Sequence, residues 1–277
     1  MREGMYRQVI QEIQDLRRLD WSKVRHSSGT AGSFLKSREM IRGVKWYYKL
    51  SDYDAYRGIV GHECINELIA DRLLTILQIP HLPYQLIHAR IQIEDKEIVT
   101  WLCRSKDYKR PDESKIALDT FYQMERLGSE SPLDFCIRQG WAEYVYQMLV
   151  IDFLILNRDR HGANMEVLRS RTGKSYRLAS LFDQGLSLFC SIHNEKDLEN
   201  IDPMADRRVQ CFVGSGSAVR NLGLIPKDYL RVPGKLRETD REYLFRDLSE
   251  ALPPAYQDAI WEMIWRRWEY YESLCDS

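Results

Sequence analysis

The sequence predicts an α+β fold with two lobes, in which a small, strand-rich N-terminal lobe with one key helix precedes a larger, mainly helical lobe. Residues 44–50 and 85–103 show the alternation typical of β-strands, and residues 63–77 carry apolar side chains at helical spacing. The remainder of the chain has mostly helical patterns. We therefore assign residues 1–104 to the small lobe and residues 105–277 to the helical lobe of a single domain. With 277 residues, 44% of them apolar, the chain is long enough to bury a sizeable core.

Four elements are expected in the small lobe. The first is an amphipathic helix, because apolar residues recur at helical spacing at Tyr6, Ile10, Ile13 and Leu16. Residues 44–50 predict a strand, and the helix of residues 63–77 ends shortly before Pro80. Residues 85–93 and 97–103 flank a polar turn and predict a β-hairpin.

The larger lobe is expected to be mainly helical. Residues 134–156 predict one long helix or two. Two short apolar runs, residues 165–168 and 178–182, flank a turn and predict a second small hairpin. Residues 191–235 are polar and irregular. A final helix with an aromatic core face follows the pair Pro253–Pro254.

Composition and charge exclude several classes of protein. A formal net charge of -1 lacks the basic excess of a general nucleic-acid binder, so we expect no direct contact with nucleic acid. The cysteines are scattered without a C-x-x-C pair, which argues against a zinc site and favours free thiols in a cytoplasmic protein. The N-terminus lacks the unbroken apolar run of a signal peptide. The most apolar stretch, residues 144–156, contains Asp152 and is too short to cross a bilayer, so no membrane span is expected.

Three polar residues form the pattern with the clearest chemistry. Asp159 stands five positions before Asn164 within the string Asn-Arg-Asp-Arg-His-Gly-Ala-Asn, and Asp183 follows a later apolar run. Phosphoryl transfer needs one carboxylate to orient an acceptor hydroxyl and accept its proton, and hard oxygen ligands to hold Mg²⁺ on the phosphates of ATP. The order found here is that of the catalytic and metal-binding loops of protein kinases. The alternative is that these residues only form turns.

The string of residues 157–164 resembles the catalytic loop of HipA-like bacterial serine/threonine kinases, and it is also similar to that of phosphatidylinositol kinases. Residues 44–50 resemble the HipA-like strand that carries the nucleotide-binding lysine, and residues 66–74 resemble the helix that carries its partner glutamate. The resemblance covers about residues 25–275. It implies a bilobal protein-kinase-like fold, ATP and Mg²⁺ as cofactors, and a protein substrate of unknown identity.

This resemblance assigns a role to each residue of the catalytic and metal-binding loops. Asp159 would be the catalytic base, and Asn164 and Asp183 would hold Mg²⁺. His161 would lie beneath the loop and orient Asp159, or it would be a buried structural histidine.

The resemblance also implies an ion pair in the small lobe. Lys49 would contact the α- and β-phosphates, and Lys45 is a rival on the same face of the strand. Glu67 would pair with that lysine, and Glu63 is a rival one helical turn earlier.

Two further segments complete the expected nucleotide site. In the loop of residues 27–33, glycines free backbone N–H groups to approach phosphate. The residues expected to bind there are Ser28, Gly29, Thr30, Gly32 and Ser33. Ser28, or Ser27, is also a candidate for autophosphorylation, because HipA-like kinases can phosphorylate a serine beside this loop. Adenine would lie against the backbone near Trp101 and Cys103, although Trp101 could equally be plain core.

The sequence departs from the family in three respects. HipA-type toxins carry an extra N-terminal subdomain and pair with a DNA-binding antitoxin. Only one expected helix precedes the phosphate loop here, so we expect no such subdomain and regard an antitoxin partner as doubtful. The metal loop reads Asp-Gln-Gly instead of Asp-Phe-Gly. Residues 191–221 lack a recognisable phosphosite loop and would instead shape the acceptor site, where Arg207, Arg208 and Arg220 either contact an acidic or phosphorylated partner or form a solvated face.

The function that these patterns indicate is ATP- and Mg²⁺-dependent phosphoryl transfer to a serine or threonine hydroxyl of a protein, including autophosphorylation. Two alternatives stay open at this point. One is a small-molecule or phosphoinositide-type kinase, and the other is a nucleotide-binding pseudokinase.

Overall fold

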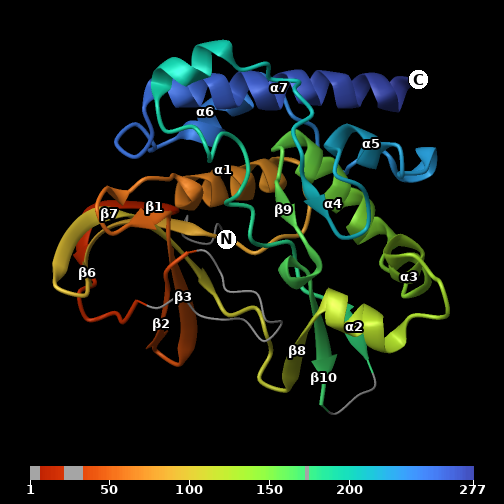
Figure 1. The fold of residues 1–277 in the computed structure, drawn as a ribbon, viewed down its shortest axis with the longest axis horizontal. Coiled ribbons are helices and arrows are strands. Elements are labelled where there is room, and N and C mark those ends of the chain that lie inside the picture. Colours follow the sequence, from red (N-terminus) through yellow and green to blue (C-terminus); the bar gives the residue numbers. More distant parts are fainter. Residues whose placement is uncertain (1–6, 22–33, 172–174) are drawn as a thin grey trace, which may run out of the picture.

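The computed structural model describes residues 7–21, 34–171 and 175–277. Five strands of the N-terminal lobe form one sheet in the order β1-β6-β7-β3-β2 (Figure 1). Their bounds are Val9–Asp15 for β1, Lys36–Ile41 for β2, Val44–Leu50 for β3, Gln85–Ile93 for β6 and Lys96–Lys106 for β7. All neighbours in this sheet are antiparallel except β1, which runs parallel to β6. A separate small ladder joins β4 (Tyr53–Asp54) to β5 (Gly58–Ile59).

The strand β3 shows why the alternation in the sequence was informative. Trp46, Tyr48 and Leu50 are buried in a cluster on one face of the sheet, so Lys49 must extend from the other face. The predicted bounds of β3 and β6 agree with the structure. The strand β7 continues to Lys106, three residues beyond the expected end of the hairpin.

The prediction of an N-terminal helix is wrong. The segment forms β1, which pairs with β6 from Val9 opposite Leu86 to Asp15 opposite Arg90. Within β1, Val9 is the only buried residue, so the strand gains little from the apolar positions that suggested a helix. Instead, pairing with the edge of β6 gives the backbone N–H and C=O groups of both strands hydrogen-bond partners. This pairing outweighs the preference for a helix that the apolar spacing suggested.

Helix α1 (Glu63–Ile76) lies between the sheet and the C-terminal helices (Figure 1). Every residue from Glu63 to Leu74 is buried, because the helix packs against strands on one side and against α6 on the other. The predicted helix of residues 63–77 is therefore confirmed to within one residue at its end. Its central position explains why even its carboxylates and its arginine are buried.

The helical lobe contains the helices expected in residues 134–156 and at the end of the chain, further helices that were not predicted, and a small sheet. The helices are α2 (Leu118–Glu125), α3 (Pro132–Arg138), α4 (Ala142–Leu154), α5 (Ala218–Leu222), α6 (Asp240–Phe245) and α7 (Pro254–Asp276). Residues 134–156 thus form two helices, which was one of the two expectations. The predicted second hairpin is present as β10 (Glu166–Ser170) and β11 (Tyr176–Leu178), and β8 (Glu113–Ala117), which was not predicted, extends it to three strands.

Three 3-10 turns and one short ladder complete this lobe. The turns span Gly162–Asn164, Glu195–Asn200 and Lys227–Tyr229. The ladder joins β9 (Asp159–Arg160) to β12 (Gln210–Cys211) in parallel, so the segment that follows the metal loop runs beside the catalytic loop.

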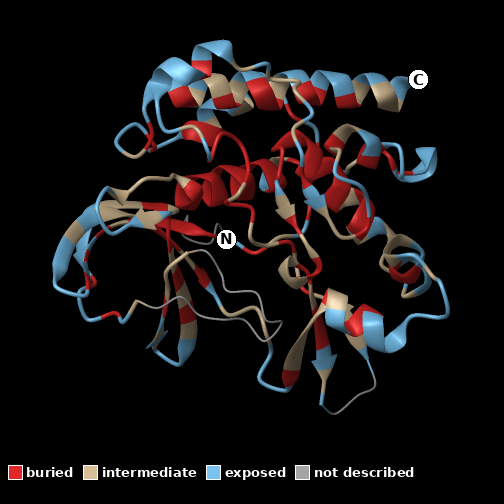
Figure 2. Cartoon of the chain, viewed as in Figure 1, coloured by how far each residue is buried: buried red, intermediate tan, exposed pale blue. Residues whose placement is uncertain are grey.

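One large apolar cluster connects the two lobes. It contains residues of α1, α4 and α7 together with the inner face of β6 and β7, and Figure 2 shows α1 and α4 as the most continuously buried elements. A second cluster covers the other face of the sheet. Among the described residues, no helix is both long and apolar enough to span a membrane. The division of the chain at residue 104 stays a prediction.

Candidate active site

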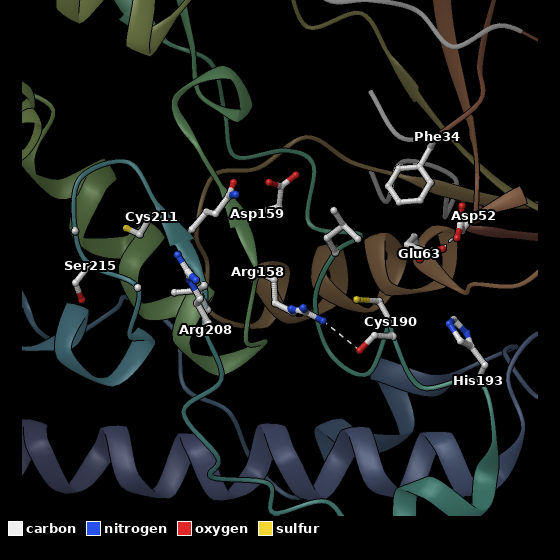
Figure 3. A pocket seen from close by; sticks show the side chains of 16 residues that line it. Phe34, Asp52, Glu63, Arg158, Asp159, Cys190, His193, Arg208, Cys211 and Ser215 are labelled. Carbon is white, nitrogen blue, oxygen red and sulfur yellow. Dashed lines mark hydrogen bonds between the residues drawn. The ribbon is translucent and has the colours of Figure 1, made fainter. Parts of the chain in front are cut away.

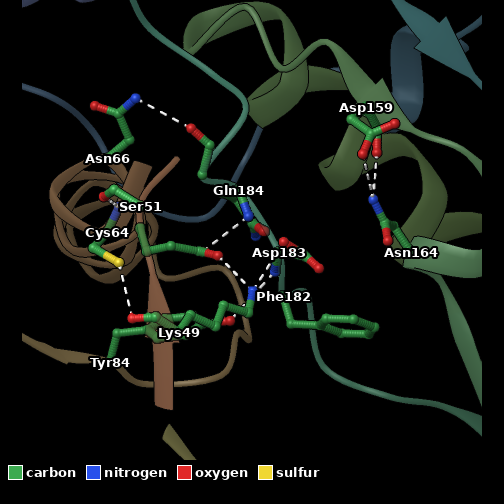
Figure 4. A network of polar contacts seen from close by, with 12 residues as sticks. Lys49, Ser51, Cys64, Asn66, Tyr84, Asp159, Asn164, Phe182, Asp183 and Gln184 are labelled. Carbon is green, nitrogen blue, oxygen red and sulfur yellow. Dashed lines mark hydrogen bonds and ion pairs between the residues drawn. The ribbon is translucent and has the colours of Figure 1, made fainter. Parts of the chain in front are cut away.

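The ion pair of the small lobe joins Lys49 on β3 to Glu67 on α1. Lys49 Nζ donates to Glu67 Oε1 at 2.8 Å and to Asp183 Oδ1 at 2.9 Å (Figure 4). The rival residues are engaged elsewhere, because Lys45 Nζ lies 4.8 Å from the Tyr47 ring centroid and Glu63 Oε2 accepts from the Asp52 N–H. The structure therefore brings Lys49, Glu67 and Asp183 together in a buried cluster.

Helix α1 also positions the backbone of the metal loop. Glu67 Oε2 accepts from the Gln184 N–H at 2.9 Å, and Asn66 Nδ2 donates to the carbonyl of Gly185 at 3.1 Å. A Cβ added at Gly185 would lie 3.1 Å from both Cβ and the carbonyl oxygen of Glu63, so the glycine permits this close approach. Asp183 itself has a φ of 60°, a left-handed conformation that Asp tolerates better than most residues.

The catalytic loop holds Asp159, His161 and Asn164 against one another. Asn164 Nδ2 donates to the Asp159 carbonyl at 2.7 Å and to Asp159 Oδ2 at 3.1 Å. His161 Nδ1 accepts from the Ala163 N–H, which places the ring proton on Nε2, 3.5 Å from Asp159 Oδ1. The side chain of His161 is 32% exposed, so it is not the buried histidine that we considered. It lies beside Asp159, where it can orient the carboxylate.

The catalytic loop and the metal loop meet through a buried arginine that sequence reasoning missed. Arg160 forms a bidentate ion pair with Asp152 of α4, with distances of 2.9 and 2.8 Å, and its Nη1 donates to the Phe182 carbonyl at 3.0 Å. Asn157 Nδ2 donates to the same Asp152 at 2.9 Å. The one sign of this ion pair in the sequence was a charged residue, Asp152, inside an otherwise apolar helix. Figure 4 shows the result, in which Asp183 lies between Lys49 and the pair formed by Asp159 and Asn164.

The electrostatic surroundings of Asp159 and Asp183 shift the pKa values of these two carboxylates in opposite directions. Burial raises the pKa of Asp159, and the negative charge of Asp183 adds to this effect, although His161 opposes it. Burial also acts to raise the pKa of Asp183, but the ammonium groups of Lys49 and Lys36 outweigh it and hold that pKa well below its ordinary value. Asp183 is therefore an anion at any physiological pH.

Lys36 is a second lysine at the site that the sequence did not reveal. It pairs in register with Lys49 across β2 and β3, so both side chains leave the same face of the sheet. Burial lowers the pKa of Lys36, while the charge of Asp183 opposes this shift. Two cationic side chains therefore face the carboxylate of the metal loop.

The donor set fits Mg²⁺. Asn164 uses both N–H groups of its amide on Asp159, so its Oδ1 is available as a hard ligand together with the Asp183 carboxylate. Within the described ranges, no group of three His, Cys, Asp or Glu side chains converges as a complete metal cage. Two protein oxygens suit Mg²⁺, which usually keeps several waters and binds substrate phosphates.

The remaining predicted residues lie at the edge of this site or outside the description. Trp101 stacks on His88 in the middle of the hairpin, with ring centroids 4.6 Å apart, and Cys103 is fully buried beside Cys64. Because β7 continues to Lys106, the backbone that follows the strand begins at Asp107, beyond the expected adenine position. The expected phosphate loop, with Ser28, Gly29, Thr30, Gly32 and Ser33, lies outside the described residues.

A cavity of about 750 Å³ adjoins Asp159 (Figure 3). Its lining includes Asp159 and Arg158 of the catalytic loop, Arg208 and His193 from the segment after the metal loop, and Glu63 and Asp52 of the small lobe. Lys49, Asn164 and Asp183 do not line it. The cavity therefore reaches from Asp159 to the small lobe without being lined by Lys49, Asn164 or Asp183.

The sheet lobe, the central helix α1 and the lysine–carboxylate cluster define a kinase-like α+β fold. No family model matches the chain. The crystal structure of the Helicobacter pylori proinflammatory kinase CtkA superposes with a TM-score of 0.66 and 16% sequence identity, and it covers 92% of this chain and 93% of that one. The fold class is thereby confirmed.

Two further proteins align with this chain, and the sequence match to one of them supports a resemblance to serine/threonine-protein kinases. The serine/threonine-protein kinase CtkA of Helicobacter pylori strain J99 is 29% identical over 102 residues, which span 32% of this chain and 31% of that protein. HipA of Shewanella oneidensis, in a complex with HipB and operator DNA, aligns over 92% of this chain and 68% of its own, but its TM-score of 0.38 and identity of 14% carry no argument. The aligned segment thus spans about a third of the curated relative.

Proposed function

We propose that this protein transfers the γ-phosphoryl group of ATP to a serine or threonine hydroxyl of a protein, in an Mg²⁺-dependent reaction that includes autophosphorylation. The observation that carries the proposal is the contact of Lys49 with both Glu67 and Asp183, next to the Asp159–Asn164 pair. The name of CtkA as a serine/threonine-protein kinase supports the same class of acceptor. The free thiols of all six cysteines agree with a cytoplasmic location, which we include in the proposal.

Each residue has a defined task in this reaction. Lys49, held by Glu67, would neutralise and position the α- and β-phosphates. Asn164 and Asp183 would hold Mg²⁺, which supplies positive charge to the phosphates when it is bound. Lys36 would add a second positive charge on the same side. Cationic groups suit this position, because charge accumulates on the phosphate oxygens during transfer.

Asp159 would act on the acceptor. It would orient the hydroxyl and accept its proton as the new oxygen–phosphorus bond forms. The bond between the γ-phosphorus and the bridging oxygen breaks in the same step, and ADP leaves with that electron pair. The raised pKa of Asp159, caused by burial, makes this carboxylate a better proton acceptor than an exposed one.

The experiment that tests this function follows radiolabel from γ-labelled ATP into a mixture of protein acceptors, with phosphoamino-acid analysis of the products. We expect Mg²⁺-dependent label on serine or threonine.

Asp183→Asn should reduce the transfer about a hundredfold or more, because it weakens the metal site and removes the anion that holds Lys49. The matched control is Asp95→Asn, which makes the same change at an exposed turn. Nucleotide binding without transfer to protein would contradict the proposal and point to a small-molecule or lipid acceptor, or to a pseudokinase.

A further inference from the structure

The cavity beside Asp159 is positioned to receive the acceptor. Asp159 lines it, whereas the residues proposed to hold the phosphates and Mg²⁺ lie outside it. An acceptor hydroxyl at Asp159 must approach from the side opposite the nucleotide, because transfer requires the attacking and leaving oxygens to be roughly in line. The cavity therefore offers space for the side chains that flank the acceptor residue.

The wall of this cavity in the helical lobe is cationic. Arg158 lies directly before Asp159, and Arg208 lies two residues before the strand β12 that pairs with Asp159 and Arg160. Figure 3 shows both arginines near Asp159, with the Arg158 guanidinium directed toward Cys190. Within the part of the chain that the structure describes, neither arginine forms an ion pair with a carboxylate. Their charges are therefore available for an anionic ligand.

Hydrogen bonds place the backbone of both arginines, and one also holds the side chain of Arg158. The Arg158 N–H donates to the Leu186 carbonyl at 2.9 Å, and its Nη1 donates to Ser191 Oγ at 3.1 Å. Arg208 forms a bridge with Ser217, and the Gln210 N–H donates to the Arg158 carbonyl at 3.0 Å. A cationic side chain that is already held in place, as Arg158 is by Ser191, loses less conformational entropy on binding than a flexible one.

The part of the lining that the small lobe supplies contains two carboxylates, Glu63 and Asp52. Glu63 is buried and accepts from the Asp52 N–H at 3.0 Å, and burial raises its pKa. This carboxylate is thus already satisfied within the small lobe. Asp52 is exposed at the rim of the cavity. Near Asp159, the positive charges of Arg158 and Arg208 therefore offer contacts for an anionic ligand.

We propose that this cavity binds an acidic protein segment, in which carboxylate side chains near the acceptor hydroxyl contact Arg158 and Arg208. The inference rests on the proposed kinase function and names its class of substrate. A phosphorylated side chain offers the same anionic chemistry, so the test includes both sources. Charge-assisted contacts of this kind add affinity, and they also fix which residue of the bound segment lies at Asp159.

The experiment compares peptides with one serine that is flanked by glutamate, lysine, alanine or phosphoserine. Binding is measured by fluorescence anisotropy of labelled peptide, and transfer is measured as kcat/KM. We expect the wild-type protein to favour the glutamate peptide over the lysine peptide by about tenfold or more in both readouts. The preference should shrink as salt rises. A phosphoserine peptide that alone binds and reacts would overturn the carboxylate assignment.

Arg208→Glu tests the residue directly, because this arginine is exposed and its replacement does not disturb the core. We expect the preference to disappear or to reverse toward the lysine peptide. The matched control is Arg220→Glu on α5, which makes the same charge change outside the cavity and should retain the preference. Arg158→Gln provides a second variant with the same expected loss of preference.

The outcomes separate this inference from the proposed function. Equal transfer to acidic and basic peptides, or equal effects of Arg208→Glu and Arg220→Glu, would overturn the acceptor assignment while the kinase function stands. Selective binding of the acidic peptide without any transfer would support the anion-binding role of the cavity and contradict the kinase function.

Discussion

At the scale of single residues, Asp159 lies in the catalytic loop beside both His161 and Asn164. Its spacing to Asn164 predicted a shared loop, and the two side chains form a hydrogen bond of 3.1 Å. The choice of Lys49 over Lys45, and of Glu67 over Glu63, could not be made from the sequence. Positions four apart lie on one face of a strand or helix, and only the contacts of Lys49 with Glu67 and Asp183 in the structure distinguish them.

The residue-scale prediction concerns the cost of ionising Asp159. Burial raises its folded-state pKa above the ordinary value of 3.8. The folded protein thus holds this proton more tightly than the unfolded chain does, so ionised Asp159 lowers stability at a pH above the folded-state pKa. We expect Asp159→Asn to raise the urea midpoint at a pH of about 7. The gain should shrink as the pH falls through the folded-state pKa of Asp159, where the wild-type carboxyl takes up its proton.

Urea unfolding of both proteins across this pH range provides the measurement. Asp95→Asn, at an exposed turn, controls for the change of an acid to an amide. A midpoint for Asp159→Asn below that of the wild type at neutral pH would contradict this account of the site.

At the scale of elements, α4 and the catalytic loop depend on one buried ion pair. Arg160 is 1% exposed, and both of its contacts with Asp152 are shorter than 3 Å. The sequence showed each residue but not the pairing, because an isolated charge in an apolar helix acquires meaning only from a partner that folding brings to it. The first strand was missed for a related reason, since its partner β6 lies far along the chain.

The element-scale prediction is that Asp152→Ala destabilises the protein by about 3–5 kcal/mol, because it leaves Arg160 buried without a counter-charge. The free energy of unfolding by urea measures this effect. Glu143→Ala removes an exposed carboxylate from the first turn of the same helix and should cost less than about 1 kcal/mol. An equal loss of unfolding free energy in the two variants would show that the Asp152–Arg160 ion pair does not stabilise the catalytic loop.

At the scale of the whole molecule, the sequence predicted the order of elements better than their arrangement. Local alternation and helical spacing identified β3, β6 and α1, because each periodicity reports which face is buried. The position of α1 between the sheet and the C-terminal helices depends on contacts between distant segments. The cavity beside Asp159 likewise depends on the pairing of β9 with β12, for which two-residue strands leave no signal in the sequence.

The central claim concerns this arrangement as a whole, in which the small lobe supplies Lys49 and Glu67 and the helical lobe supplies Asp159, Asn164 and Asp183. The measurement that tests it most directly is the intact mass of the purified protein after incubation with ATP and Mg²⁺, beside an Asp159→Ala variant. We predict that the wild-type protein gains the mass of at least one phosphoryl group and that the variant gains none while it still binds ATP. An equal gain in both proteins would contradict the assignment of Asp159, and a wild-type protein that neither gains phosphate nor binds ATP in the presence of Mg²⁺ would contradict the kinase function itself.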